Sequence, residues 1–176
     1  SIVIEEYTGI NCGYCPDGHR RANEIMAAHP DRVWIINIHE GGYAANTYTT
    51  QFGTALANQT GLTGYPAGTV NRHVFAGSVT DLNRGQWASA TNNMLGTASP
   101  VNIAADGTLD WTTRTLNIRV QLYYTAAQTV TSNALNVAIL QDNVLGSQSG
   151  MSANPDQVVG NQSNHMHILR LLITGI

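Results

Sequence analysis

The sequence predicts an α/β domain over residues 1–96, followed by a linker at 97–100 and an all-β, sandwich-like domain over residues 101–176. Two observations predict this division. Near the start, two β-branched apolar runs flank a stretch with helical periodicity, which is the pattern of a βαβ unit. After the linker, apolar residues alternate at strand spacing and no helix is needed. The four strands expected there do not complete a seven-stranded sandwich.

The βαβ unit begins with a strand at Ile2–Glu6. A helix follows from Pro16 to about Ala28, because its apolar residues recur at helical spacing and Pro16 suits a first turn. Asp17 lies near the positive end of this helix. The continuous apolar run in Arg32–His39 predicts a central strand that is covered on both faces.

The rest of the first domain is less regular. We expect an insertion at about 40–63, with a short helix near 50–59. Turn residues then precede a tight hairpin that pairs 67–71 with 73–76. A helix capped by Asp81 and reaching about Leu95 closes the domain.

The second domain is expected to hold strands at 101–104, 116–124, 134–141 and 167–173, with a long polar loop at 146–164. Alternation of apolar and polar residues is clearest in the second of these strands. The polar loop offers a surface for contact with another molecule.

Composition excludes several classes of protein. The formal net charge is -3, and all eight basic residues are arginine, so there is no basic stripe for nucleic acid. No apolar run approaches the roughly 20 residues that span a bilayer. Methionine, tryptophan and tyrosine residues fit packing better than a cofactor pocket, and we expect no cofactor.

The two cysteines of the chain form a Cys12-Gly13-Tyr14-Cys15 motif. A thiolate attacks a disulfide, and unpaired amides at a helix start favour a thiolate. We therefore expect an exposed Cys12 as the attacking thiol. Cys15, one helical turn further on, is expected to be buried and to resolve the mixed disulfide.

Two other interpretations of the cysteine pair remain open. A zinc site would need further ligands, but His19 is the one nearby candidate, and His165 and His167 fit a polar strand face better than a metal pair. A structural disulfide is the second alternative. The βαβ context favours redox chemistry over both.

The order of strand, CxxC, helix, strand, Gly64-Tyr65-Pro66, hairpin and helix resembles the thioredoxin superfamily over roughly residues 1–96. The resemblance implies that Pro66 has a cis peptide bond beside the motif, where backbone groups can pair with an extended peptide. Tyr65, Gly13 and Tyr14 are then expected to border the substrate. An ordinary trans turn proline is the alternative.

Glu6 matches the buried carboxylate that exchanges a proton with the resolving cysteine in thioredoxins, which have Asp there. Burial would allow it to accept a proton from Cys15. A satisfied strand-end Glu is the other interpretation, and Glu5 should face the opposite side of the sheet. His39 and Glu40 end the second strand near the motif, but solvated strand ends are more common, so they are left outside the catalytic set.

Ile4-Glu5-Glu6-Tyr7-Thr8-Gly9 with Cys15-Pro16-Asp17-Gly18-His19-Arg20 also resembles the twenty-eight-kilodalton outer-membrane protein family of Bacteroides-type bacteria. This resemblance implies a location in the cell envelope, periplasm or outer membrane, or secretion, with any lipid anchor preceding residue 1. The expected activity is disulfide exchange with protein or peptide thiols. The alternative is a surface binding or adhesion module without turnover.

Overall fold

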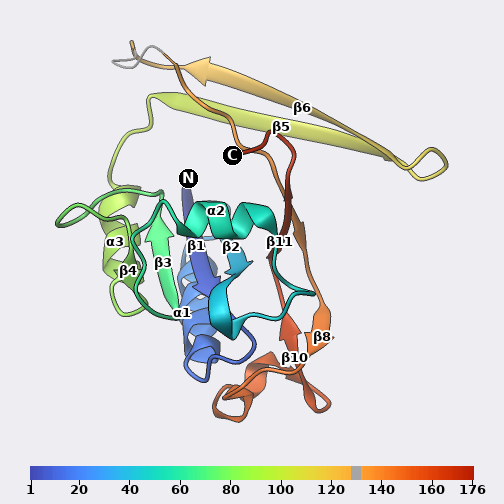
Figure 1. Ribbon diagram of the computed structural model, residues 1–176. Helices are drawn as coiled ribbons and strands as arrows, with labels where there is room; N and C mark the ends of the chain where they lie inside the picture. Colours follow the sequence, from blue (N-terminus) through green and yellow to red (C-terminus); the bar gives the residue numbers. More distant parts are fainter. Residues whose placement is uncertain (128–131) are drawn as a thin grey trace. The chain divides into compact units, whose positions relative to one another are not determined.

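The computed structural model describes residues 1–127 and 132–176, and the chain divides into two compact units (Figure 1). Unit 1 combines Ser1–Leu95 with Leu135–Ile176, and unit 2 is Gly96–Ala134. Unit 1 therefore contains both ends of the chain.

A six-stranded mixed sheet forms the centre of unit 1, in the order β4-β3-β1-β2-β11-β7. Its strands are β1 (Ile2–Thr8), β2 (Val33–His39), β3 (Ala67–Val70), β4 (Leu82–Asn83), β7 (Ala138–Gln141) and β11 (Ile168–Leu172). Strands β1, β2 and β11 run parallel, while β3 is antiparallel to β1 and β7 to β11. The predicted βαβ unit is thus confirmed at the centre of the sheet.

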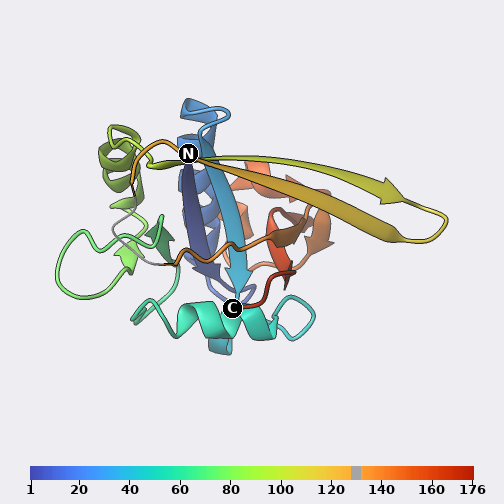
Figure 2. The same ribbon diagram turned by 90° about the horizontal axis from the view of Figure 1, so that it is seen from above.

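Helices cover both faces of this sheet (Figure 2). The helices are α1 (Cys15–Ala28), α2 (Gln51–Ala57) and α3 (Trp87–Leu95), and the short 3-10 turns are η1 (Gly41–Tyr43), η2 (Met151–Ala153) and η3 (Pro155–Gln157). Apolar residues of α1 and α3 share one core cluster with Ile4 and Ile35, whereas α2 packs with Tyr7 and Ile38. No helix in the described ranges is long and apolar enough to cross a bilayer.

The sheet face toward α1 changes from apolar to polar along the strands. Successive residues of β1 alternate between faces, so Ile2 and Ile4 lie in the α1 core and Glu6 and Thr8 continue the same row. The paired positions on β2 are Asn37 beside Glu6 and His39 beside Thr8, and all four polar residues are buried. This buried polar row lies at the strand ends that lead to the cysteine motif.

A second, three-stranded sheet occupies part of the predicted 146–164 loop. It has the order β8-β10-β9 and consists of β8 (Val144–Gly146), β9 (Val158–Val159) and β10 (Gln162–His165). The loop prediction was therefore wrong in part. Short strands such as the two residues of β9 are too brief to show periodicity.

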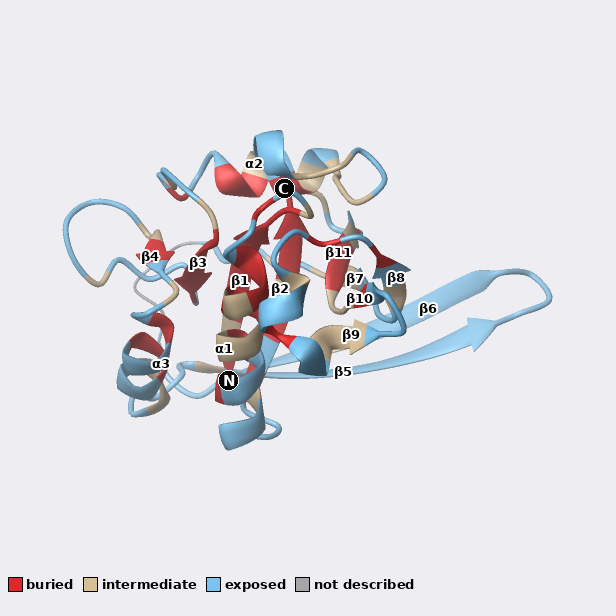
Figure 3. Cartoon of the chain, turned by 90° about the horizontal axis from the view of Figure 1, so that it is seen from below, coloured by how far each residue is buried: buried red, intermediate tan, exposed pale blue. Residues whose placement is uncertain are grey.

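Unit 2 is a long hairpin of β5 (Val101–Asp110) and β6 (Thr115–Tyr124). The register places one set of apolar pairs on one face: Val101 with Tyr124, Ile103 with Leu122, Ala105 with Val120 and Leu109 with Leu116. The other face carries polar residues, among them the ion pair of Arg119 and Asp106 at 2.7 Å. Most of the hairpin is exposed, as its pale blue colour shows in Figure 3.

The structure corrects the expectation of a sandwich-like domain at 101–176. Strands β7 and β11 pair with each other, and β11 joins β2 of the central sheet, so they belong to the sheet of unit 1, whereas β5 and β6 form a two-stranded sheet of unit 2. Alternating strands look alike in sequence whether they join a sandwich or extend an existing sheet. Residues 128–131 of the predicted domain lie outside the described residues.

Two local predictions were also wrong. Strand β3 pairs with Leu82–Asn83 rather than with residues 73–76, because positive φ angles at Asn71 and Arg72 turn the chain away at its end. Asp81 does not cap a helix, since β4 follows it and α3 begins only at Trp87. The insertion helix and the helix after the cysteines lie where they were expected.

Candidate active site

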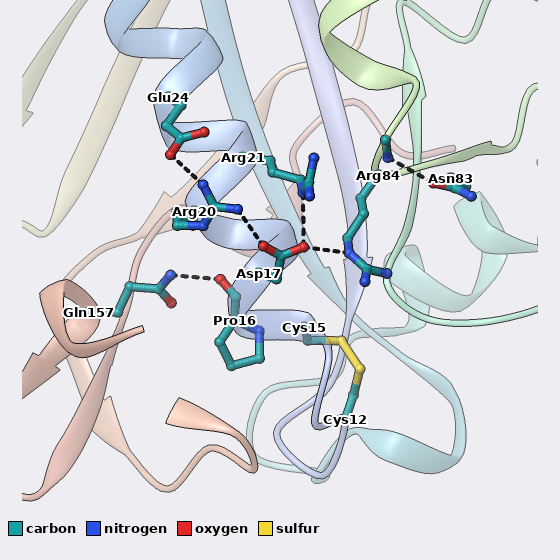
Figure 4. Close-up of polar contacts among 11 residues, drawn as sticks. Cys12, Cys15, Pro16, Asp17, Arg20, Arg21, Glu24, Asn83, Arg84 and Gln157 are labelled. Atoms are coloured by element: carbon teal, nitrogen blue, oxygen red, sulfur yellow. Dashed lines mark hydrogen bonds and ion pairs between the residues drawn. A yellow bond between two sulfur atoms is a disulfide. The ribbon is translucent and has the colours of Figure 1, made fainter. Parts of the chain in front are cut away.

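Cys12 and Cys15 form a disulfide at the start of α1, with their Cα atoms 5.4 Å apart (Figure 4). The helix begins at Cys15, and its N-cap residue, Tyr14, makes no side-chain capping bond. The Cys15 amide donates to the Cys12 carbonyl at 3.3 Å, and Pro16 occupies the first turn. The positive end of the helix therefore lies beside the sulfur atoms, where it stabilises a thiolate.

Both cysteines are buried, which corrects the expectation that Cys12 is exposed. Cys12 is 4% exposed and Cys15 is 0% exposed. The order of accessibility still favours Cys12 as the residue that meets a substrate. Cys12 is shielded because residues that are far away in the sequence contact the loop that carries it.

That part of the chain is residues 148–157, here called the bracket segment. The Gln148 Nε2 group donates to the carbonyl oxygens of Gly9 at 3.2 Å and Cys12 at 3.0 Å. The backbone amide of Ser149 donates to Ile10 at 2.7 Å, and Gln157 donates to the Pro16 carbonyl at 2.7 Å (Figure 4). The bracket segment thus holds the loop that carries the disulfide on both sides of the motif.

Gly150 allows the bracket segment to approach the motif closely. It has a φ of +76°, and a Cβ atom there would overlap the backbone of Gly13. A residue with a side chain at this position would push the bracket segment away from the disulfide loop. The sequence offered no signal for this contact, because glycine is common in the chain and the two residues are far apart.

Pro66 lies against the first turns of α1, and the Tyr65–Pro66 peptide bond is cis, as the resemblance implied. A Cβ atom at Gly18 would come within 3.0 Å of Pro66 Cβ and Cγ and 2.5 Å of Glu6 Oε1. Gly18 is therefore the point of α1 where the proline and the carboxylate both approach the helix. Tyr65 is half-buried and packs edge-on against Tyr43, with ring centroids 5.6 Å apart.

The two residues between the cysteines face outward. Tyr14 is 71% exposed, and the Arg84 guanidinium carbon lies 5.5 Å from its ring centroid. Gly13 has open space at its Cβ position. Both Gly13 and Tyr14 are therefore exposed, whereas Tyr65 is half-buried.

Asp17 connects the motif to three arginines (Figure 4). Its carboxylate accepts from Arg20 at 2.5 Å, Arg21 at 2.9 Å and Arg84 at 2.7 Å. Burial opposes ionisation, but these hydrogen bonds outweigh it and hold the pKa of Asp17 well below its usual value. The first turn of α1 therefore carries a fixed negative charge that is compensated locally.

Glu6 is fully buried, and its partner is His19 of α1. Glu6 Oε2 lies 3.0 Å from His19 Nδ1, and His19 Nε2 lies 3.4 Å from Thr8 Oγ1. Glu5 faces the other side of the sheet, as predicted, where Arg72 and Thr69 bind its carboxylate. The two adjacent glutamates thus have separate partners, on opposite faces of the sheet.

His39 and Glu40 are buried, which corrects the expectation that the end of the second strand is solvated. The His39 ring stacks on Tyr48 at 4.9 Å and meets His165 edge-on at 5.5 Å. Burial, with the charges of His19, His165 and Arg170, lowers the pKa of His39 to about 3. Burial also raises the pKa of Glu40.

His165 belongs to the same cluster and not to a shared strand face with His167. It ends β10, while His167 has a φ of +56° and lies between β10 and β11. Burial and the neighbouring His19 lower the pKa of His165 to about 4. Within the described ranges, no group of three or more His, Cys, Asp or Glu side chains is placed to hold a metal ion.

A βαβ-centred sheet, with a CxxC disulfide at the start of its first helix and a cis proline against that helix, defines a thioredoxin-like protein. The chain belongs to the family described as outer membrane protein Omp28, whose sequence profile matches residues 53–176. The matched range begins after the cysteine motif. No curated protein matches the sequence.

Two solved structures share the fold. HBP35 of Porphyromonas gingivalis superposes with a TM-score of 0.77 at 19% identity and covers 98% of this chain. A structural genomics protein from Agrobacterium tumefaciens has a TM-score of 0.56 at 13% identity, covering 98% of this chain and 71% of its own. The present chain spans 56% of the HBP35 chain.

Proposed function

We propose that this protein exchanges disulfides with protein or peptide thiols through Cys12 and Cys15. The observation that carries the proposal is the disulfide at the uncapped start of α1, one helical turn from the point where Pro66 meets the helix. Amides at a helix start stabilise the thiolate that exchange requires. A structural disulfide would not need this position.

The exchange proceeds in two balanced steps. In the reduced protein, the Cys12 thiolate attacks a substrate disulfide, forms a mixed disulfide and releases one substrate thiolate. Cys15 then attacks Cys12 Sγ, which closes the Cys12–Cys15 bond and releases the second substrate sulfur as a thiolate. Two electrons pass to the substrate, and the reverse sequence oxidises a substrate dithiol.

The substrate we propose is an extended segment of a polypeptide. The bracket segment covers one flank of the motif, so a substrate approaches from the flank of Tyr14, Tyr65 and the backbone before Pro66. Backbone groups beside a cis proline can pair with an extended chain. Exposed Tyr14 supplies an apolar ring for a residue next to the substrate cysteine.

We place this activity in the cell envelope. The name of the Omp28 family associates its members with the outer membrane, and disulfides persist in such oxidising compartments.

The test is to trap the mixed disulfide on a peptide that contains one disulfide. Cys15→Ser leaves the attacking thiol without a resolving partner, so we expect a covalent adduct by mass spectrometry under non-reducing conditions. Cys12→Ser is the matched control and should form far less adduct. Equal or absent trapping in the two variants would refute the assignment of Cys12.

A second candidate is a binding module that keeps the frame without turnover. The amphipathic hairpin of unit 2 favours it, because the hairpin has an apolar face and, among the described residues, its sheet consists of two strands. A double Cys12→Ser, Cys15→Ser variant separates the two. If that variant still binds a protein partner of the wild-type chain, the result would support the binding module. Loss of that binding would support exchange.

A further inference from the structure

The carboxylate of Glu6 and the imidazole of His19 form a buried pair under the disulfide. Glu6 is 0% exposed and His19 is 9% exposed, and 3.0 Å separates Oε2 from Nδ1. A carboxylate and an imidazole within hydrogen-bond distance can share a proton, which either member can hand on to a reacting group. The pair can therefore carry one proton between its two members.

Helix geometry brings this pair to the resolving cysteine. Cys15 and His19 are four residues apart on α1, so they lie on the same helix face with Cβ atoms roughly 6 Å apart. Both residues are buried. Glu6 Oε1 approaches the helix at Gly18, between them in sequence, and has no hydrogen-bond partner among the described residues.

The titratable groups around the pair do not compete for its proton near neutral pH. His39 on β2 and His165 on β10 have pKa values lowered to about 3 and about 4, so both remain neutral. Arg170 on β11 adds positive charge near His39. Of these three histidines, His19 is the one with a carboxylate partner in the part of the chain that the structure describes.

A small cavity lies beside the pair. It has a volume of about 20 Å³, and its lining includes His19, Asn37, His39 and His165 together with Asn23 and Gln157. This volume holds one water molecule. Asn23 and Gln157 also line a surface groove of about 450 Å³ between α1 and the η2–η3 turns.

We propose that His19 is a proton-transfer residue of the exchange reaction, acting with Glu6 on the Cys15 thiol and passing the proton toward the groove through the histidine-lined cavity. The inference rests on the proposed exchange at Cys12 and Cys15. It adds a residue and an exit route to that reaction. It also explains why the polar row of β1 and β2 is buried beneath the start of α1.

The proton moves in step with the sulfur chemistry. When Cys15 attacks Cys12 Sγ, its thiol proton passes to the Glu6–His19 pair, and the released substrate thiolate takes a proton from solvent. When the disulfide is reduced, Cys15 leaves as a thiolate and the pair returns the proton. The pair thus gains the proton that the Cys15 thiol loses when the disulfide forms, and the thiol regains that proton when the disulfide is reduced.

The test follows reduction of the wild-type disulfide by dithiothreitol between pH 5 and 9. His19→Gln keeps a hydrogen-bond donor toward Glu6 but does not titrate, so we expect a rate at least tenfold lower near pH 7 and a flatter pH profile. His73→Gln, at an exposed position outside the site, is the matched control. Glu6→Gln should give a similar loss, and the double variant little more, because the two act as a unit.

A second measurement does not depend on the variants. Histidine ring resonances of the wild-type protein are compared by NMR in the oxidised and reduced forms at pH 7, and those of His19 should differ between the two forms because the Glu6–His19 pair and the Cys15 thiol exchange a proton. An unchanged pH profile in His19→Gln, or identical His19 resonances in the two forms, overturns the inference. If instead the wild-type disulfide is reduced normally but Cys15→Ser traps no peptide, the proposed function fails and the proton-transfer inference fails with it.

Discussion

The side chain of Gln148 donates a hydrogen bond to the carbonyl oxygen of Cys12 at 3.0 Å, across 136 residues of sequence. The same amide also donates to Gly9 at 3.2 Å. Gln148 is 4% exposed, so these bonds are made away from solvent. The conformation of the disulfide loop therefore depends on a residue from the far end of the chain.

Replacing Gln148 should weaken the folded state. Gln148→Ala leaves two buried carbonyl groups without this donor, and we expect the free energy of unfolding to fall by about 1–3 kcal/mol. Gln148→Glu should cost more, because a carboxylate cannot donate to them. Urea unfolding of the oxidised protein measures the change. Gln162→Ala, at an exposed position, is the control, and an equal loss there would contradict the prediction.

Acid should destabilise the protein through His39 and His165. Their pKa values are lowered in the folded state to about 3 and about 4, so the unfolded chain binds their protons first as the pH falls below about 6.5. The free energy of unfolding therefore decreases from pH 6.5 toward pH 4, by up to about 1.4 kcal/mol per pH unit for each histidine.

The variant that tests this pH dependence is His165→Asn. The variant should take up about one proton fewer when it unfolds in acid. Its free energy of unfolding should therefore fall less steeply with decreasing pH, as measured by urea unfolding at a series of pH values. His73→Asn, on the surface, should leave the slope as it is. A slope unchanged in His165→Asn would show that this histidine does not stay neutral in the folded protein.

Glu5 is a buried carboxylate that depends on Arg72. Arg72 Nη2 donates to Glu5 Oε1 at 2.6 Å, and the Glu5 side chain is 4% exposed. Arg72→Ala leaves this charge without its cation, so we expect a loss of about 3 kcal/mol in the free energy of unfolding. Glu24→Ala removes an exposed ion pair of α1 and should change stability far less. Similar losses in the two variants would contradict this ranking.

Gly18→Ala should destabilise the protein, although the same substitution usually stabilises a helix. Gly→Ala within a helix normally gains about 0.5–1 kcal/mol. At Gly18, however, the new Cβ atom would lie 2.5 Å from Glu6 Oε1, so Gly18→Ala should lower the thermal midpoint and slow reduction of the disulfide. Gly42→Ala, with open space at its Cβ position, is the control. A raised midpoint in Gly18→Ala would show that Glu6 moves away freely.

The central elements could be predicted from sequence because their signals are local. Strand β1, helix α1 and strand β2 each show their own periodicity, and the order of these elements with the CxxC motif restricts the fold. The placement of β7 and β11 could not be predicted. Strand β11 pairs with β2 across more than 100 residues of sequence, and β7 joins the central sheet through β11; such distant pairing leaves no periodic signal.

The residues of the site also divide into those with a local signal in the sequence and those placed by contacts between distant segments. The motif identified the disulfide, and the resemblance pointed to Pro66 and Glu6. His165 and Gln148 were missed as site residues because they reach the site only through the second sheet and the bracket segment. A buried histidine and a solvated one look the same in a single sequence.

The order of the segments along the chain has a consequence for biosynthesis. Cys12 and Cys15 precede the hairpin of unit 2, and the bracket segment follows it. A chain that emerges with its N-terminus first therefore presents both thiols to oxidants before residues 148–157 have been delivered. The cysteine pair can therefore be oxidised on the nascent chain, and the bracket segment covers the disulfide only after it has been synthesised.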